Sequence, residues 1–286
     1  MALKIVTDSA CDLPEDVIKA LAIEVFPILV YVNGGEYLDC VTMKPDELYQ
    51  MMSEGATVKT AQIPLHYFMK RFEEFAKTED SYIYLAFSSN LSGTHQTSLL
   101  ALQEIKETYQ DADITVIDTK CASLGLGILV EEVARKVKEG MGKETALLLI
   151  GHLMTEINHV FSVDDLEYLF RGGRVSRSQA MIGNILNIKP ILNVQDGFLI
   201  PIDRAKGKKK LLSKLYDYIK IHGVNLEGQT VGIAHTQNEV EALAVKAFFN
   251  ETFGTENFII NQLGCAVGAH CGPGMIAIFF KGKNAS

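Results

Sequence analysis

Three short segments of this chain carry hydroxyl, imidazole and glycine residues in patterns that suit the binding of an anion. The first is Gly268–Gly274, of sequence GAHCGPG, which lies between two apolar runs of strand length. Glycine and proline hold backbone shapes that other residues resist, so we expect a loop that presents His270 and several backbone N–H groups. Such a loop suits an anionic head group, and it is equally compatible with a tight structural turn.

The other two segments follow or precede predicted secondary structure. Ser88–Thr94, of sequence SSNLSGT, comes after an apolar strand and opens a helix. Hydroxyl groups there can cap the helix, and its free N–H groups and dipole can hold an anion. Thr60–Gln62 is expected to form a loop that precedes a proline and a helix. A fourth segment, Asp8 with Ser9, follows the first strand, at the edge where open α/β sheets bind ligands. For each segment, simple capping is the competing interpretation.

Two charged segments stand apart from these. Asp164–Ser176 contains paired acids followed by Arg-Gly-Gly-Arg, which could bind a metal or a phosphate. The simpler interpretation is that Gly172 and Gly173 end one helix while Arg171 and Arg174 pair with the acids. A basic cluster, Arg204–Lys210, lies on an otherwise acidic chain and could dock an acidic partner or membrane phosphates.

The sequence lacks the common motifs of nucleotide-binding and catalytic sites. It contains no GxxxxGK[ST], GxGxxG, HExxH or GxSxG motif. A hydrolase or acyltransferase that uses Ser92 or Cys271 as its nucleophile stays open as the alternative function. His270 and Cys271 are neighbours in sequence, and such neighbours usually point in different directions.

Hydrophobic patterning predicts an α/β protein of two domains. Residues 1–155 alternate strands and helices, which is typical of a parallel sheet covered by helices. Residues 156–286 add a hairpin signal at Gln195–Gly197 and predict a mixed sheet. The predicted strands are Leu3–Thr7, Val25–Val32, Tyr82–Phe87, Asp113–Asp118, His159–Val163, Lys189–Val194, Phe198–Asp203, Thr230–His235, Phe258–Leu263 and Met275–Phe280. The predicted helices include Leu65–Lys77, Ser92–Tyr109, Ser123–Glu139, Lys143–Ile157, Ser176–Ile185, Lys208–His222 and Glu239–Glu251.

Composition narrows the class of protein. The net charge of −8 argues against a general nucleic-acid binder, whose affinity needs many lysines and arginines. Five cysteines without a CxxC motif favour reduced thiols and a cytoplasmic location. No signal peptide is expected, because polar residues bound the first apolar run, and every apolar run is too short to span a membrane.

Taken in order, six motifs resemble those of the bacterial DegV family. They are Asp8-Ser9 with Asp12–Pro14, Lys59–Gln62, Ser88–Thr94, Leu166–Arg174, Lys189–Leu192 and Gly268–Gly274. The resemblance implies an α/β/α domain with a parallel sheet joined to an α/β domain with a mixed sheet, with a long-chain fatty acid buried between them. Some members are the acyl-carrying subunits of bacterial fatty acid kinase, whose separate ATP-using subunit phosphorylates the bound carboxyl group.

The resemblance also implies roles for residues. Thr60, Ser92 and His270 would bind the carboxyl group as neutral or switchable donors, without a lysine or arginine in their three segments. Supporting ligand loops would contain Ser9, Gln62, Gly93, Thr94 and Gly268. Ala61 departs from the family pattern, which often has serine there. Arg204 would face the kinase subunit.

The expected protein is therefore a carrier that presents its fatty acid to a kinase, with no cofactor, no metal and no catalysis of its own. It would contact membranes transiently and would not bind nucleic acid. A third interpretation is a regulator whose acyl ligand controls a protein partner.

Overall fold

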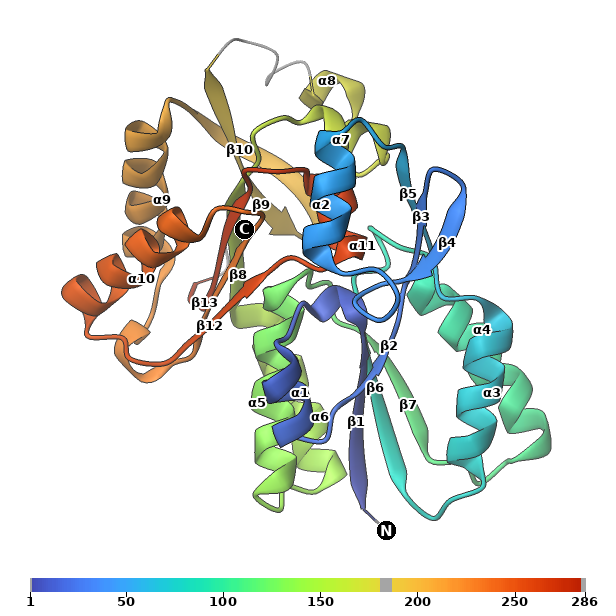
Figure 1. Cartoon of the computed structure of the whole chain (residues 1–286). Coiled ribbons are helices and arrows are strands. Elements are labelled where there is room, and N and C mark those ends of the chain that lie inside the picture. Colours follow the sequence, from blue (N-terminus) through green and yellow to red (C-terminus); the bar gives the residue numbers. More distant parts are fainter. Residues whose placement is uncertain (1, 181–186, 284–286) are drawn as a thin grey trace.

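The computed structural model describes residues 2–180 and 187–283, and its first layer is a four-stranded parallel sheet (Figure 1). In spatial order the strands are β2 (Glu24–Phe26), β1 (Leu3–Asp8), β6 (Ser81–Ala86) and β7 (Ile114–Asp118). The helices around it are α1 (Glu15–Ala20), α3 (Leu65–Ala76), α4 (Thr94–Thr108), α5 (Leu124–Lys138) and α6 (Lys143–Glu156). Helices α3 and α4 cover one face, and α5 and α6 the other. This is the predicted parallel α/β arrangement.

The second layer is a six-stranded mixed sheet. Its strands, in spatial order, are β10 (Phe198–Lys206), β9 (Ile188–Gln195), β8 (Ile157–Ser162), β13 (Ile276–Lys281), β11 (Val231–His235) and β12 (Phe258–Gln262). Strands β11 and β12 run parallel, and the other neighbouring pairs run antiparallel. Its outer face packs against α9 (Lys208–His222) and α10 (Glu239–Phe253), as Figure 1 shows. The predicted mixed sheet is confirmed.

Helix α5 lies between the two sheets and contacts β1 on one side and β11 on the other. Two glycines in its first turns explain how closely the mixed sheet and the turn after β1 approach this helix. A Cβ at Gly125 would lie 2.1 Å from His159 Nε2, and one at Gly127 would lie 2.5 Å from the Cys11 carbonyl oxygen. Glycine lowers helix stability by about 1 kcal/mol relative to alanine. Here it leaves room for a strand and a loop to pack directly on the helix.

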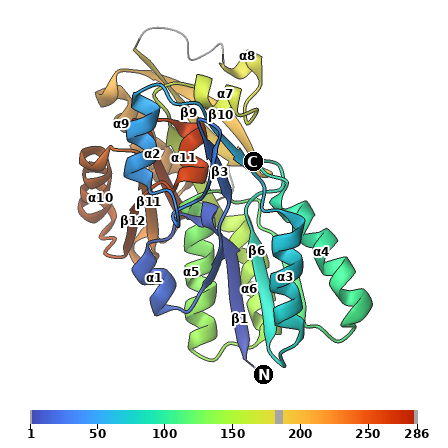
Figure 2. The same cartoon turned by 45° about the vertical axis from the view of Figure 1, so that its right-hand side comes forward.

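A small antiparallel sheet and several short helices close the space above these layers (Figure 2). The sheet consists of β4 (Gly35–Leu38), β3 (Leu29–Val32) and β5 (Val58–Ala61), and the helices are α2 (Pro45–Ser53), α7 (Glu167–Arg171), α8 (Arg177–Ala180) and α11 (Cys265–Cys271), with 3₁₀ turns at Ser9–Cys11 and Leu226–Gly228. No helix in residues 2–180 and 187–283 is long and apolar enough to cross a membrane.

Three local predictions were wrong. The predicted strand Val25–Val32 divides into β2 and β3, because Pro27 cannot donate to a sheet and the chain leaves the first sheet there. Thr60 belongs to strand β5 rather than to a loop. The predicted loop around Gly268 is the helix α11, in which a Cβ at Gly268 would lie 2.1 Å from Tyr49 Oη. That glycine therefore serves close packing and not a turn.

Of the predicted helix Ser176–Ile185, the structure has α8 at Arg177–Ala180, and residues 181–186 lie outside the described part. Buried residues of the parallel sheet and of the inner face of the mixed sheet form one continuous hydrophobic cluster. The division into domains 1–155 and 156–286 stays a prediction.

Candidate functional site

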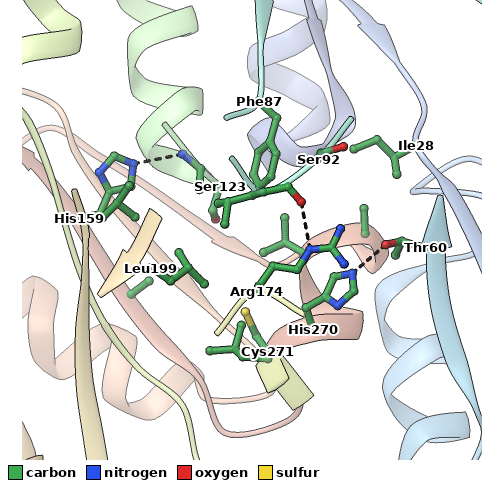
Figure 3. Close-up of a pocket in the computed structure, with 18 of the residues that line it drawn as sticks. Ile28, Thr60, Phe87, Ser92, Ser123, His159, Arg174, Leu199, His270 and Cys271 are labelled. Carbon is green, nitrogen blue, oxygen red and sulfur yellow. Dashed lines mark hydrogen bonds between the residues drawn. The ribbon is translucent and has the colours of Figure 1, made fainter. Parts of the chain in front are cut away.

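A cavity of about 400 Å³ lies where the two sheets, the small sheet and α11 meet (Figure 3). Residues from both halves of the chain line it. Its apolar wall is formed by Ala10, Ile28, Ala61, Phe87, Leu91, Ala122, Phe161, Leu169, Val194, Leu199, Ala266, Val267, Met275, Ala277 and Phe279. Polar side chains gather in two places on that wall. No aspartate or glutamate is among the lining residues that the structure describes.

The first polar group brings Thr60, Ser92, Arg174 and His270 to one part of the cavity, as Figure 3 shows. Strand β5 supplies Thr60, the segment before α4 supplies Ser92, and the last turn of α11 supplies His270. Thr60 Oγ1 and His270 Nε2 are 2.7 Å apart and share a hydrogen bond. The three residues that the sequence singles out as carboxyl ligands thus line the same cavity.

Arg174 is the residue of this group whose role sequence reasoning missed. Its predicted pairing with local acids is wrong, because Nε donates to the Leu91 carbonyl oxygen at 3.0 Å and Nη1 donates to the Gly172 carbonyl oxygen. Across the described residues it forms no ion pair, whereas Arg171 pairs with an acid of the same segment, Glu167, at 2.9 Å. Burial lowers the pKa of the Arg174 guanidinium. A half-buried cation therefore faces the cavity.

His270 is neutral at physiological pH. Burial, and after it the positive charge of Arg174, lower the pKa of its imidazole to about 4. A Cβ at Gly172 would lie 2.2 Å from His270 Nδ1, so the Arg-Gly-Gly-Arg turn packs directly on the ring. This close packing explains why position 172 is a glycine, which helix termination alone does not explain.

Ser92 lies just before helix α4, which begins at Thr94 rather than at Ser92. Its Oγ is 3.0 Å from Thr94 Oγ1 and accepts from the Thr94 N–H at 3.3 Å. A Cβ at Gly93 would lie 1.8 Å from Gln62 Oε1, so Gly93 makes room for Gln62, whose Nε2 donates to Thr97 at 2.7 Å. These contacts fasten the segment after β5 to the start of α4.

The supporting residues fall into two groups. Gln62 and Gly93 line the cavity, whereas Ser9, Thr94 and Gly268 lie behind its wall. Ser9 donates to Asp39 Oδ2 at 2.7 Å and accepts from the Ile28 N–H at 3.0 Å. Its hydroxyl is therefore engaged by the protein itself.

The second polar group lies at the other end of the cavity, around His159 and Ser123 (Figure 3). His159 Nε2 accepts from the Ala122 N–H at 3.2 Å, and burial lowers the pKa of this imidazole to about 4. Ser123 donates to Asp12 Oδ2 at 2.6 Å. Nothing in the sequence pattern marks His159, which sits in an apolar strand like any core residue.

Neither candidate nucleophile has the surroundings of an activated one. Ser92 Oγ pairs with a threonine hydroxyl rather than with an imidazole. Burial raises the pKa of the Cys271 thiol to about 12, which disfavours the thiolate that attacks. Within the described ranges, no group of three or more His, Cys, Asp or Glu side chains could hold a metal ion.

Fold and cavity together are those of an α/β protein with a largely apolar cavity, whose polar lining residues include a half-buried cation. The chain belongs to the DegV family, because the family model described as "uncharacterised protein, DegV family" matches residues 2–283. A DegV domain-containing protein of Caldanaerobacter subterraneus is 37% identical over 281 residues, which cover 98% of this chain and 99% of that protein.

Solved structures agree with this assignment. A structure titled "Fatty Acid Binding of a DegV family Protein from Thermus thermophilus" aligns with a TM-score of 0.86 at 31% identity, covering 98% of this chain and 99% of that one. The fatty acid kinase (Fak) B3 protein of Streptococcus pneumoniae, loaded with linoleic acid, aligns with a TM-score of 0.86 over 98% of this chain and 99% of that one. At 20% identity, the second match shows the shared fold alone.

The Arg174–His270 pair yields a direct prediction. Arg174→Gln should raise the pKa of His270, because it removes one of the two causes that hold this pKa near 4. Titration of the His270 ring signals by NMR measures the effect. Arg171→Gln, which changes an exposed arginine already paired with Glu167, is the control and should leave the His270 pKa unchanged. An equal His270 pKa in the wild type and in Arg174→Gln would contradict the assigned proximity.

Proposed function

We propose that this protein binds a long-chain fatty acid in the cavity, with its carboxylate at Thr60, Ser92, Arg174 and His270. The observation that carries the proposal is the combination of a long apolar wall with a cation that lacks a carboxylate of its own in the described chain. Such a cavity suits a molecule with an apolar body and one anionic end.

The chemistry of the polar end supports a carboxylate. Hydrogen bonds to a charged group contribute about 1.5–3 kcal/mol each, and Arg174 can add charge pairing to donors from Thr60 and Ser92. This differs from the neutral donor set expected from the sequence, because a guanidinium reaches the site from a fourth segment. His270, neutral at pH 7, keeps one ring N–H that can donate.

The acyl chain would occupy the apolar part of the cavity, toward Leu199 and Phe279. Each buried methylene contributes about 0.8 kcal/mol. About fifteen methylenes then contribute roughly 12 kcal/mol before the entropic cost of association, so binding that survives purification is expected. The acyl chain would thus lie in a buried tunnel between the two predicted domains.

The protein would act as a carrier that presents the carboxyl group to a separate ATP-using kinase subunit. The family resemblance suggests this partner, and the surface around Arg204 offers a place for it. Arg204, Lys206, Lys209 and Lys210 are exposed and form no ion pair among the residues described. Asp203, the acid beside Arg204, is already engaged by Lys214 at 2.6 Å. The basic cluster Arg204–Lys210 would also favour transient contact with anionic membranes.

A fatty acid should remain bound through purification. Denaturation and organic extraction followed by mass spectrometry should recover long-chain fatty acid at about one molecule per chain. A protein that yields none, and whose melting temperature does not respond to added oleate or palmitate, would refute the carrier function. Esterase turnover that is lost in Ser92→Ala or Cys271→Ala would support the alternative hydrolase function instead.

Substitution of a carboxyl-binding residue should weaken fatty acid binding, whereas substitution of a neighbour that does not line the cavity should leave it unchanged. Ser92→Ala should weaken fatty acid binding by about 1–3 kcal/mol, and Arg174→Gln by at least as much, because the buried carboxylate loses a donor or its counter-charge. Ser89→Ala is the matched control, since Ser89 Oγ bonds to Lys120 and does not line the cavity. Calorimetric titration with oleate measures these differences, and unchanged affinity in both site variants would remove them from the site.

Arg204→Ala should leave the fatty acid content and melting temperature unchanged while it weakens acyl phosphate formation with the kinase subunit. The reason is that an exposed charge contributes to encounter with a partner rather than to folding. The difference from wild type should shrink at high salt, where charges are screened. Lys138→Ala, at the far end of α5, is the control. Loss of stability and ligand together with phosphorylation would instead indicate a structural role for Arg204.

A further inference from the structure

Three buried aspartates, Asp8, Asp12 and Asp39, lie behind the wall of the cavity. Their exposed fractions are 0%, 4% and 1%. They come from the end of β1, from the turn after it and from the segment after β4. The carboxyl groups of Asp12 and Asp39 are close neighbours, because a single Cβ placed on Gly264 would lie 2.9 Å from Asp12 Oδ1 and 3.1 Å from Asp39 Oδ1.

Asp39 and Asp12 hold the start of helix α11, whose last turn carries His270. Asp39 Oδ1 accepts from the Cys265 N–H at 2.6 Å, and Asp12 Oδ1 accepts from the Gly264 N–H at 2.9 Å. These bonds span more than two hundred residues of sequence. They join the first part of the chain to the helix that places the imidazole.

The other bonds of the three aspartates also reach residues of the cavity wall. Asp12 Oδ2 accepts from Ser123, a wall residue, at 2.6 Å. Asp8 Oδ2 accepts from the N–H of Phe87, another wall residue, at 2.9 Å. Asp39 accepts from Ser9, whose oxygen in turn accepts from the N–H of the wall residue Ile28 at 3.0 Å. Every aspartate therefore positions part of the cavity.

Among the residues that the structure describes, no counter-charge accompanies these carboxyl groups. The titratable side chains that face them are Cys11, Cys40, Tyr49, Tyr84, Cys265 and Cys271, all of which are neutral or anionic. Lys44 Nζ, an exposed ammonium, donates to the Cys40 carbonyl oxygen and forms no ion pair with the cluster in the described structure. A second or third negative charge here would be buried without a partner.

We propose that Asp12 and Asp39 are positioning residues of the ligand site, and that loss of a proton from this cluster loosens the cavity wall and speeds release of the ligand. The proposal rests on the proposed function, since the ligand is taken to be a fatty acid. Retention of the fatty acid would then depend on a proton that the aspartate cluster holds, away from the carboxylate-binding end of the cavity.

The direction of the pH effect follows from the difference between the pKa of Asp12 in the closed protein and in the opened, hydrated protein. Burial raises the pKa of Asp12 to about 8 and that of Asp8 to about 6, against an ordinary value of 3.8. Between pH 4 and 8 the closed protein thus holds a proton on Asp12 that an opened, hydrated Asp12 gives up. Opening becomes easier by up to about tenfold per pH unit over this range and levels off above pH 8.

The histidines of the cavity act in the opposite direction, but at lower pH. His159 and His270 have pKa values of about 4 in the folded protein and an ordinary value of 6.5, so they favour the closed state as pH rises from 4 to 6.5. Above pH 6.5 their contribution is constant. From pH 6.5 to 8 the histidines therefore do not contribute, and comparison with Asp12→Asn separates the effect of Asp12 from that of Asp39, whose pKa burial also raises.

The test is the rate at which cis-parinaric acid, a fluorescent long-chain fatty acid, leaves the protein for phosphatidylcholine vesicles. In wild type the rate should rise about tenfold or more from pH 6.5 to 8 and then level off. Asp12→Asn should abolish this rise, whereas Asp16→Asn, which changes an exposed aspartate nearby, should retain it. An Asp12→Asn profile that matches wild type would overturn the proposal.

A second variant keeps the test decisive if Asp12→Asn does not fold. The negative charge of Asp39 is one cause of the raised pKa of Asp12, so Asp39→Asn should move the levelling-off point to lower pH. Infrared spectroscopy of wild type should show the band of a protonated carboxyl group disappearing through pH 8. An unmoved profile or a missing band would overturn the proposal, whereas failure of wild type to bind the probe at any pH would overturn the proposed function itself.

Discussion

Two backbone N–H groups at the start of helix α11 donate to buried carboxyl groups, and these bonds fix the helix whose last turn carries His270. The helix belongs to the second half of the sequence, yet it packs on α2, β3, β5 and α7. If it shifted along its axis, His270 would lose Thr60, and Ala266 and Val267 would leave the cavity wall. A seven-residue helix with a central glycine has little stability of its own. Its position therefore depends on the aspartates that hold it.

Much of the fold could be predicted from sequence. Apolar strands alternating with amphipathic helices indicated the parallel sheet, and the Gln195–Gly197 turn indicated the hairpin that β9 and β10 form. The errors occurred where a short segment takes its conformation from distant contacts. Gly268 suggested a loop because glycine is common in turns, but it is required in α11 by the hydroxyl of Tyr49, more than two hundred residues away.

The neutral polar residues at the Thr60 end of the cavity could be singled out from the sequence, whereas the cation beside them could not. Thr60, Ser92 and His270 stand in motifs whose hydroxyl, imidazole and glycine content suits an anion, and all three line the cavity. Arg174 stands beside acids, and in sequence that arrangement favours a surface ion pair. Only the chain path shows that Gly172 turns the backbone against His270 and brings Arg174 inward, to the carbonyl oxygen of Leu91. Sequence proximity to an acid is thus a poor guide to where a guanidinium points.

The position of α5 between the two sheets has a consequence for cooperativity. Its buried face belongs to the hydrophobic cluster that includes β1 and reaches the inner face of the mixed sheet. Unfolding either sheet alone would leave one side of this helix, including Leu126 and Ile128, in contact with water. The two sheets consequently share one source of hydrophobic stability and should exchange their amide hydrogens as a single cooperative unit rather than as two independent ones.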